Sequence, residues 1–172
     1  MHSRPQTPNP SLSPSVSMQP SDTATAETAP ARAPIRVLFL CTHNAGRSQM
    51  AEWTLRHIGR ERFEVFSAGT EISEVNPLTR QVLTNAGVPM PGARSKHVDE
   101  FAGQLFDFVI TVCDRANESC PVFPGDVVRI HWSFADPSAA TGTEAERLRV
   151  FEDIRRQITT RLHTWVLAIK ER

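Results

Sequence analysis

The stretch IRVLFLCTHNAGRS, residues 35–48, joins a β-favouring apolar run to a short polar loop, with a cysteine at the junction. The run from Ile35 to Leu40 is nearly continuous in apolar residues, which is typical of a central strand in a parallel sheet. Cys41 follows the run directly, and a helical pattern extends from Ser48 to Ile58. The sequence therefore predicts a cysteine at the carboxyl end of a buried strand, where ligands bind in open α/β sheets.

Strand-like and helix-like segments alternate along the rest of the chain. A second apolar run, from Phe106 to Val112, also ends directly at a cysteine, Cys113. Four further elements are expected: a strand at 63–66, a helix at 77–86 between Asn76 and Gly87, a strand at 127–130, and a closing helix that begins at a capping box of Thr143 and Glu146.

The closing helix carries apolar residues at steps of three and four, as a helix that faces a core does. These residues are Leu148, Phe151, Ile154, Ile158, Leu162, Trp165 and Ile169. The whole alternation predicts one α/β domain, built as a four-stranded parallel sheet with helices on both faces.

Length and composition limit the possible functions. A chain of 172 residues can hold one ordinary α/β domain but hardly two. Lys and Arg (19) balance Asp and Glu (19), so no net charge attracts nucleic acid or an anionic membrane. We find no apolar run of membrane-spanning length and no signal peptide pattern. Three cysteines are an odd number and too few for a secreted disulfide scaffold, so we expect a cytoplasmic protein. We also expect a monomer.

Residues 1–34 are rich in Pro, Ser, Thr and Ala and contain hardly any large apolar side chain. Such a segment buries too little surface to offset the entropy lost on ordering. We therefore predict a disordered tail over residues 1–34, with no function assigned, and a catalytic domain over residues 35–172.

The loop after the first strand has the features of an oxyanion cradle. Backbone N–H groups and a helix N-terminus can converge there on one anion, and Arg47 adds a bidentate fork. Ser48 can donate its hydroxyl to the sulfur of Cys41, the charge of Arg47 should lower the pKa of that thiol, and Gly46 suits a tight bend. The candidate oxyanion-binding residues are Thr42, His43, Asn44, Ala45, Gly46, Arg47 and Ser48.

Cys41 is the candidate nucleophile, because covalent catalysis on phosphate or arsenate requires a nucleophile aimed at the bound anion. The alternative is a small buried residue at a strand end. A cysteine followed by five residues, Arg47 and Ser48, placed between a strand and a helix, favours catalysis. The side chain of His43 receives no role, because a single loop histidine is more often a hydrogen-bond partner than a base.

Cys113 and Cys120 form a candidate redox pair. If residues 113–120 were helical, the two α-carbons would lie about 10 Å apart, whereas a disulfide needs less than about 7 Å. Joining them would require the polar segment 114–119 to refold. Two alternatives stay open: a core Cys113 with an idle Cys120, and a zinc site with His131. The spacing disfavours zinc, so no metal is expected.

Asp136 is the candidate general acid. It follows the last expected strand, where it can give a proton to an oxygen that leaves a bound oxyanion. An Asp followed by Pro is equally typical of an ordinary turn. Spacing alone does not choose between these two interpretations.

Taken together, these motifs resemble the thioredoxin-coupled arsenate reductases, a family that shares the fold of low-molecular-weight protein tyrosine phosphatases. The resemblance covers nearly all of residues 35–172. It rests on the strand end Val37 to Cys41, the loop and helix from Cys41 to Glu52, the segment Phe66 to Thr70, the cysteines Cys113 and Cys120 with Pro121, and the pairs His131-Trp132 and Asp136-Pro137.

The resemblance implies a mechanism that uses all three cysteines. Cys41 would attack arsenate held by Arg47, while Asp136 protonates the departing oxygen. Cys113 would then attack Cys41, so that arsenite leaves. Cys120 would next attack the resulting disulfide, and thioredoxin would reduce the pair formed by Cys113 and Cys120.

The resemblance also implies a departure at a cation site seen in some family members. Its ligands would be Asn44, Glu52 and Ser67, but Lys96 stands where a carboxylate should complete the set. An ammonium there would replace the charge of a metal, so we predict no requirement for potassium.

Two other functions compete with arsenate reduction. A tyrosine phosphatase would use the same loop, because arsenate and phosphate are nearly isosteric. Against it, a hydrolase needs no second and third cysteine, Asp136 is followed by Pro-Ser-Ala-Ala and not by aromatic residues, and the chain has no tyrosine. The other alternative is an anion-binding thiol sensor, for which the sequence indicates no partner surface.

The expected partners follow from the resemblance. Arsenate would be the substrate, phosphate and sulfate would compete for its site, and weak phosphatase activity would remain. No bound cofactor is expected. The external electron donor would be thioredoxin, which the well-separated Cys120 favours over glutaredoxin or mycothiol systems.

Overall fold

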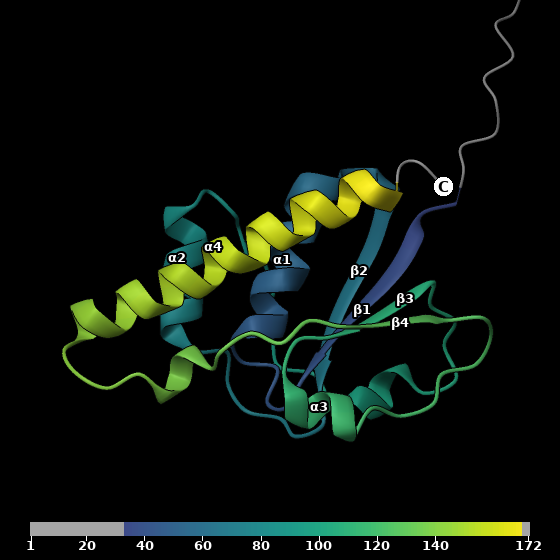
Figure 1. Cartoon of the computed structure of the whole chain (residues 1–172), viewed down its shortest axis with the longest axis horizontal. Coiled ribbons are helices and arrows are strands. Elements are labelled where there is room, and N and C mark those ends of the chain that lie inside the picture. Colours follow the sequence, from purple (N-terminus) through teal and green to yellow (C-terminus); the bar gives the residue numbers. More distant parts are fainter. Residues whose placement is uncertain (1–32, 170–172) are drawn as a thin grey trace, which may run out of the picture. The chain divides into compact units, whose positions relative to one another are not determined.

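The computed structural model describes residues 33–169. The tail predicted over residues 1–34 therefore lies outside the described residues, apart from its last two positions. Helices and strands alternate as the sequence predicts (Figure 1). The elements are β1 (Ile35–Cys41), α1 (Arg47–Gly59), η1 (Arg60–Arg62), β2 (Phe63–Gly69), α2 (Pro77–Asn85), η2 (Val98–Phe101), β3 (Phe108–Thr111), α3 (Asp114–Glu118), β4 (Val128–His131), η3 (Pro137–Ala139) and α4 (Glu144–Ala168), where η marks a 3-10 helix.

The four strands form one parallel sheet in the order β2-β1-β3-β4, which confirms the predicted fold class. β1 pairs with β2 along its whole length, from Ile35 opposite Phe63 to Cys41 opposite Gly69. β2 is therefore longer than the predicted strand at 63–66. β3 is shorter than the apolar run at 106–112, because only residues 108–111 join the ladders.

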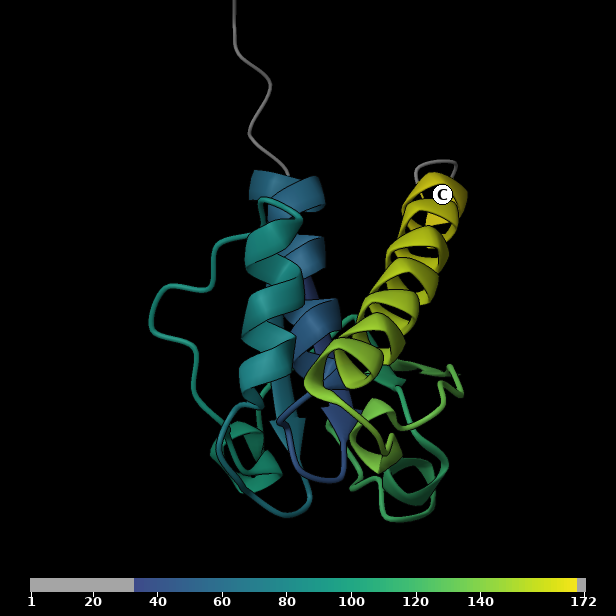
Figure 2. The same cartoon turned by 90° about the vertical axis from the view of Figure 1, so that its left-hand side faces the viewer.

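Alternate side chains of β1 contribute to two cores. Val37 and Phe39 face a core made with α1, α2 and α4, whereas Leu38 and Leu40 face a second core. The three long helices lie on the first face, with α1 and α2 side by side and α4 beside them (Figure 2). Within the described residues, the helix on the second face is the 3-10 turn η2, whose Phe101 packs among aromatic side chains. The helices expected on both faces are therefore three long helices on one face and a short turn on the other.

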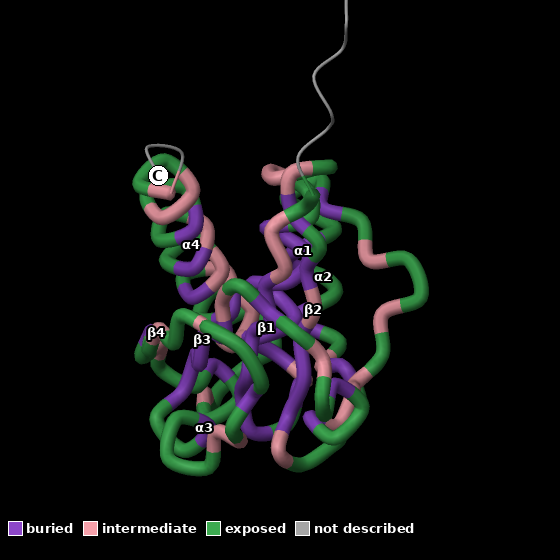
Figure 3. Tube along the Cα trace, turned by 90° about the vertical axis from the view of Figure 1, so that its right-hand side faces the viewer, coloured by how far each residue is buried: buried purple, intermediate pink, exposed green. Residues whose placement is uncertain are grey.

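Burial follows this layering (Figure 3). The central strands are buried, and α4 turns one side inward and the other to solvent. The apolar stripe predicted for α4 supplies the buried side, with Phe151, Ile154, Ile158 and Leu162 inside. The capping box of Thr143 and Glu146 starts this helix as predicted.

None of the helices described between residues 33 and 169 combines the length and the hydropathy of a membrane span.

Candidate active site

Two of the three cysteines meet at the carboxyl edge of the sheet. Cys41 is the last residue of β1, and Cys113 follows the neighbouring strand β3 and precedes α3. The chain connections leave β1 and β3 toward opposite edges of the sheet, so a crevice forms between their ends. The thiols of both cysteines are free and buried.

The sulfur of Cys41 accepts two hydrogen bonds from its own loop. The Ser48 hydroxyl lies 2.8 Å from the Cys41 Sγ, as the sequence predicts, and the Asn44 N–H lies 3.1 Å from it. The loop thus folds around the sulfur and directs polar hydrogens at it. Both contacts favour the thiolate over the neutral thiol.

Burial nevertheless raises the pKa of the Cys41 thiol above its ordinary value, and the neighbouring Cys113 raises it further, while the bonds from Ser48 and Asn44 oppose the rise. The prediction that Arg47 lowers this pKa is therefore wrong for this structure. The Arg47 guanidinium donates instead to the carbonyl of Phe134 at 2.9 Å. The guanidinium thus contacts the Phe134 carbonyl, and it does not contribute to the pKa shift of the Cys41 thiol.

The loop bends from Thr42 to Gly46, and its left-handed residue is Asn44. Asn44 has a φ of 51°, a left-handed conformation that asparagine adopts more readily than most residues. Gly46 has a φ of −129°, and a Cβ there would meet only the Thr79 hydroxyl, at 3.7 Å. The backbone also bends at Gly46, as predicted, but the left-handed residue of the loop is Asn44, which the sequence did not indicate.

The loop leaves no room for a side chain at Gly69, the last residue of β2, and the sequence did not predict this contact. A Cβ on Gly69 would lie 2.5 Å from the Thr42 carbonyl oxygen and 2.9 Å from the Asn44 nitrogen. The backbone of β2 therefore contacts the cradle directly. A glycine at the end of a short strand is the only sequence signal for such a contact.

The loop encloses a cavity of about 280 Å³, open to solvent on one side. Its lining residues are Cys41, His43, Ala45, Gly46, Arg47, Asp136, Ser138 and Ala139. This cavity brings together six of the predicted site residues. Thr42, Asn44 and Ser48 lie behind it, with their side chains buried.

Asp136 caps a turn and also lines the cavity of Cys41. Its Oδ1 accepts a hydrogen bond from the Ser138 N–H and caps η3, which is the ordinary turn. Its Oδ2 lies 3.5 Å from Arg47, and the side chain lines the same cavity as Cys41. The half-exposed carboxyl group of Asp136 therefore lines the cavity that holds the Cys41 sulfur, and the turn fixes the position of this carboxyl group.

The other two cysteines lie at the two ends of α3. The Cys113 Sγ lies 3.5 Å from the Thr42 hydroxyl, so the second cysteine contacts the loop that holds Cys41. Cys120 lies outside the cavity and is partly exposed. Burial raises the pKa of Cys120, and Arg129 opposes that rise. The five helical residues between the cysteines advance the chain by about 7.5 Å along the axis, so a bond between them requires α3 to unwind.

A buried polar cluster supports the cradle from below. The Asn44 side chain donates to Ser48 at 2.9 Å and to Ser67 at 2.8 Å, and Ser67 donates a short hydrogen bond to Glu52. The Lys96 ammonium lies 3.1 Å from the Glu52 carboxylate. The residues expected at a cation site therefore meet, but an ammonium already lies beside their carboxylate, so the cluster does not fit a potassium ion.

Two groups of polar contacts near α3 were also not predicted from the sequence. Glu71 contacts His43 at 3.5 Å and Arg115 at 3.1 Å and thus joins the cradle to α3. His131, on β4, uses both ring nitrogens, with Thr111 at 2.8 Å and Asp114 at 2.9 Å. These side chains are far apart in sequence, and single His, Asp or Glu residues give no recognisable signal.

The zinc interpretation finds no support in these contacts, because His131 faces a hydroxyl and a carboxylate and not the cysteines. Among residues 33–169, no three His, Cys, Asp or Glu side chains are grouped so that they could hold a metal ion.

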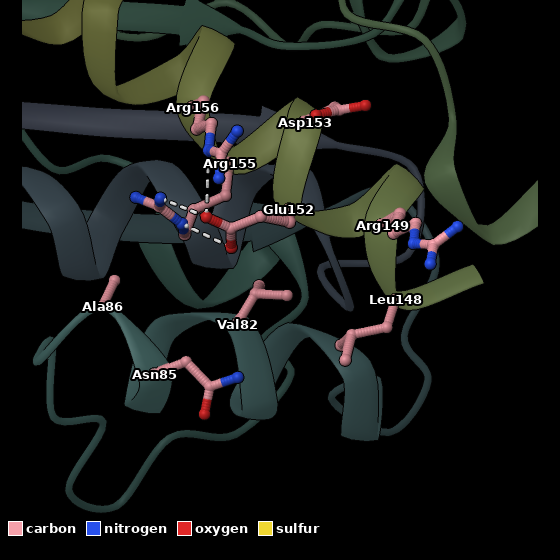
Figure 4. Close-up of a pocket in the computed structure, with 9 residues that line it drawn as sticks. All are labelled: Val82, Asn85, Ala86, Leu148, Arg149, Glu152, Asp153, Arg155 and Arg156. Atoms are coloured by element: carbon pink, nitrogen blue, oxygen red, sulfur yellow. Dashed lines mark hydrogen bonds and ion pairs between the residues drawn. The ribbon is translucent and has the colours of Figure 1, made fainter. Parts of the chain in front are cut away.

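A larger pocket of about 440 Å³ lies between α2 and α4 (Figure 4). It contains no cysteine, and its half-buried carboxylate, that of Glu152, is paired with two arginines of the same helix: Arg155 at 2.6 Å and Arg156 at 3.2 Å. The hydrogen bond from Arg155 is the main reason that the pKa of Glu152 is lowered. The chemistry of this pocket is therefore that of a helix contact, and the cysteine cavity is the candidate active site.

Residues 36–172 match the family described as low molecular weight phosphotyrosine protein phosphatase. The protein belongs to this family. Within it, the chain is 38% identical to an arsenate reductase of Halalkalibacterium halodurans over 130 residues, which span 75% of this chain and 93% of that protein.

Solved structures of the family have the same fold. A thioredoxin-dependent arsenate reductase of Corynebacterium glutamicum is 30% identical, with a TM-score of 0.63 over 81% of this chain; the match covers 64% of that longer protein. A second structure, an arsenate reductase in the phosphate-binding state, is 26% identical with a TM-score of 0.63 and covers 78% of this chain and 98% of its own. The relatives that match this chain within the family therefore include arsenate reductases.

Proposed function

We propose that the protein is an arsenate reductase that reduces arsenate to arsenite through a relay of Cys41, Cys113 and Cys120. The observation that carries this proposal is the second thiol: Cys113 lies against the cradle that holds Cys41, 3.5 Å from the Thr42 hydroxyl. A hydrolase has no use for a thiol there. The arsenate reductases among its relatives support the same reaction.

The first step takes place in the cavity. Cys41 attacks arsenic as a thiolate, which the Ser48 hydroxyl and the Asn44 N–H stabilise. Arg47 and the loop N–H groups bind the oxygens of arsenate. An As–O bond breaks as the S–As bond forms, and Asp136 gives the leaving oxygen a proton.

The second step transfers two electrons. The Cys113 thiolate attacks the sulfur of Cys41, and a disulfide forms between them. The S–As bond breaks, its electron pair stays on arsenic, and arsenic is reduced from the +5 to the +3 state. Arsenite then leaves. The Thr42 hydroxyl is positioned to stabilise the attacking Cys113 thiolate.

The third step moves the disulfide to the surface. The Cys120 thiolate attacks Cys113, and the electron pair of the broken bond leaves on Cys41, which returns to its starting form. The product is a disulfide between Cys113 and Cys120, formed as α3 unwinds. Because Cys120 is partly exposed, this disulfide is accessible to an external dithiol.

Thioredoxin is the proposed external dithiol. The relative from Corynebacterium glutamicum is thioredoxin-dependent. A relay that ends at a surface cysteine suits a protein reductant, because a bulky dithiol cannot enter a cavity of about 280 Å³. No bound cofactor is proposed.

The cavity favours a small anion over a phosphotyrosine side chain. Its lining includes Ser138 and Ala139 but no Phe, Tyr or Trp against which a phenyl ring could stack. Arsenate needs only the cradle itself. Slow hydrolysis of aryl phosphates remains an expected side activity, because the nucleophile and the acid are the same.

Steady-state turnover tests this proposal. Arsenate-dependent NADPH oxidation is measured with thioredoxin and thioredoxin reductase, for the wild type and for Cys113→Ser and Cys120→Ser. We expect turnover that falls at least a hundredfold in both variants. Hydrolysis of p-nitrophenyl phosphate, measured in parallel, should be slow and nearly unaffected by either substitution. Rapid hydrolysis without arsenate-dependent turnover would overturn the proposal in favour of a phosphatase.

A further inference from the structure

α3 is held at the sheet edge by a small polar cluster. The His131 Nε2 lies 2.9 Å from the Asp114 carboxylate, and the His131 Nδ1 lies 2.8 Å from the Thr111 hydroxyl. Thr111 also donates to the Asn117 side chain at 3.2 Å. We call His131, Thr111, Asp114 and Asn117 the α3 latch. Two of its members belong to α3, and the other two belong to β3 and β4.

The strand members of the latch are fixed by the sheet. Thr111 and His131 are directly opposite each other in the parallel pairing of β3 and β4, and Thr111 is almost fully buried. Their positions therefore do not depend on α3. Asp114, in contrast, is largely exposed and follows Cys113 directly, so its place depends on the helix that it begins.

The other contacts of α3 are weak. Arg115 pairs with Glu71 at 3.1 Å, but both side chains are exposed, and an exposed ion pair contributes little stability. Ala116 is its only buried residue, and one methyl group contributes little hydrophobic stabilisation. A helix of five residues is far too short to be stable by itself. The polar contacts of the latch are therefore a substantial part of what keeps residues 114–118 helical.

We infer that the α3 latch sets the equilibrium and the rate of the last disulfide exchange, with His131 as its positioning residue. This inference rests on the proposed relay. When Cys120 attacks Cys113 and Cys41 leaves as a thiolate, α3 must unwind, and Asp114 and Asn117 must leave His131 and Thr111. The latch thus stabilises the dithiol form of Cys113 and Cys120 relative to the disulfide. After thioredoxin returns two electrons, the latch closes again and restores Cys113 to the cradle.

The test measures the reduction potential of Cys113 and Cys120 without arsenate. In a Cys41→Ser background only these two thiols remain, and the protein is equilibrated with mixtures of reduced and oxidised dithiothreitol or lipoic acid. We expect His131→Ala and Asp114→Ala each to shift the equilibrium three- to tenfold toward the disulfide. This shift equals a potential more negative by about 14 to 30 mV. His163→Ala, an exposed histidine substitution on α4, is the matched control and should cause no shift.

The double variant Asp114→Ala/His131→Ala shows whether the two single substitutions change the reduction potential through the same contact or independently. If the two residues act through their contact, the double variant shifts the potential by clearly less than the sum of the two single shifts. Strictly additive shifts, or a potential that stays at the wild-type value in His131→Ala, would overturn the inference. Because no arsenate is used, this result does not depend on whether the wild type reduces arsenate.

A rate measurement in the intact relay completes the test. With Cys41 restored, one equivalent of arsenate is added to reduced protein, and the appearance of the disulfide between Cys113 and Cys120 is followed by mass spectrometry after acid quenching. We expect this disulfide to form several-fold faster in His131→Ala than in the wild type, with an unchanged rate of arsenite release. An unchanged rate of disulfide formation would contradict the inference.

Discussion

At the scale of the residue, the reactivity of Cys41 depends on hydrogen bonds that oppose its burial. The thiol is almost fully buried, and desolvation penalises the charged form. Ser48 gives the largest opposing contribution, at 2.8 Å from the sulfur. The nucleophile is therefore tuned by its neighbours in the loop.

Replacing Ser48 by alanine should make Cys41 a weaker nucleophile at neutral pH. Because the hydroxyl lowers the pKa of Cys41, its loss raises that pKa, and the thiolate fraction falls. In a background where Cys113 and Cys120 are serine, we expect alkylation by iodoacetamide at pH 7 to slow by about tenfold. The pH profile of alkylation should move to higher pH. Equal profiles for the two proteins would show that Ser48 does not control the thiolate.

Lys96 should stabilise the protein through its contact with Glu52. That carboxylate is buried, so loss of the ammonium leaves a charge only partly compensated by Arg56 at 2.8 Å. We expect Lys96→Met to lower the free energy of unfolding by about 2 to 3 kcal/mol. The control is Arg94→Met, which breaks an exposed pair with Glu100 and should cost about 1 kcal/mol or less.

The same contact predicts turnover that does not depend on potassium. The wild type should reduce arsenate equally fast in potassium and in sodium salts of equal ionic strength. A clear rate increase that is specific to potassium would contradict the role assigned to Lys96.

At the scale of the element, the cradle is shaped by the strand beside it. β2 ends at Gly69, where the absence of a side chain lets its backbone contact Thr42 and Asn44. The conformation of the loop thus depends on β2 as well as on its own sequence.

Gly69→Ala should impair catalysis more than it impairs folding. The added methyl group would collide with two backbone atoms of the cradle, so the loop must shift and the sulfur's hydrogen bonds must lengthen. We expect turnover to fall at least tenfold. The control is Gly103→Ala, which faces open space at a φ of 75° and should cost about 1 kcal/mol of stability without a change in turnover. Similar activity losses in both variants would contradict this account of the loop.

At the scale of the whole molecule, the buried thiols couple stability to pH. Burial raises the pKa of Cys41 and of Cys120 in the folded state. An unfolded chain ionises its thiols near pH 8.5, so above that pH the unfolded state binds fewer protons than the folded state. The contribution is fully present below the unfolded pKa and is lost as the pH rises through the folded pKa.

The free energy of unfolding should therefore fall as the pH rises from about 8 to 10. Urea unfolding under reducing conditions measures this dependence, and Cys41→Ala should make it shallower. Parallel curves for the two proteins would contradict the link to Cys41.

The sequence predicted the architecture well because its signals are local. Apolar runs, the Asn76 cap of α2 and the capping box at Thr143 each act within a few residues, and each lies in the structure where the pattern places it. The pattern from Cys41 to Ser48 likewise predicted a loop between a buried strand and a helix, and that loop lines the cavity of Cys41. Contacts between distant segments were not predictable: Gly69 against the loop, and His131 against Asp114, arise only when the strands assemble. The pKa of Cys41 was missed because burial is a property of the whole fold.

The relay of three thiols is the central claim, and a single-turnover experiment with Cys120→Ser tests it most directly. Reduced protein is mixed with excess arsenate and no reductant, arsenite is quantified, and disulfides are mapped by mass spectrometry. We predict one arsenite per protein and a disulfide between Cys41 and Cys113 that accumulates, because without Cys120 no thiol is left to attack it. Arsenite without that disulfide, or no arsenite at all from protein whose thiols are reduced, would contradict the relay.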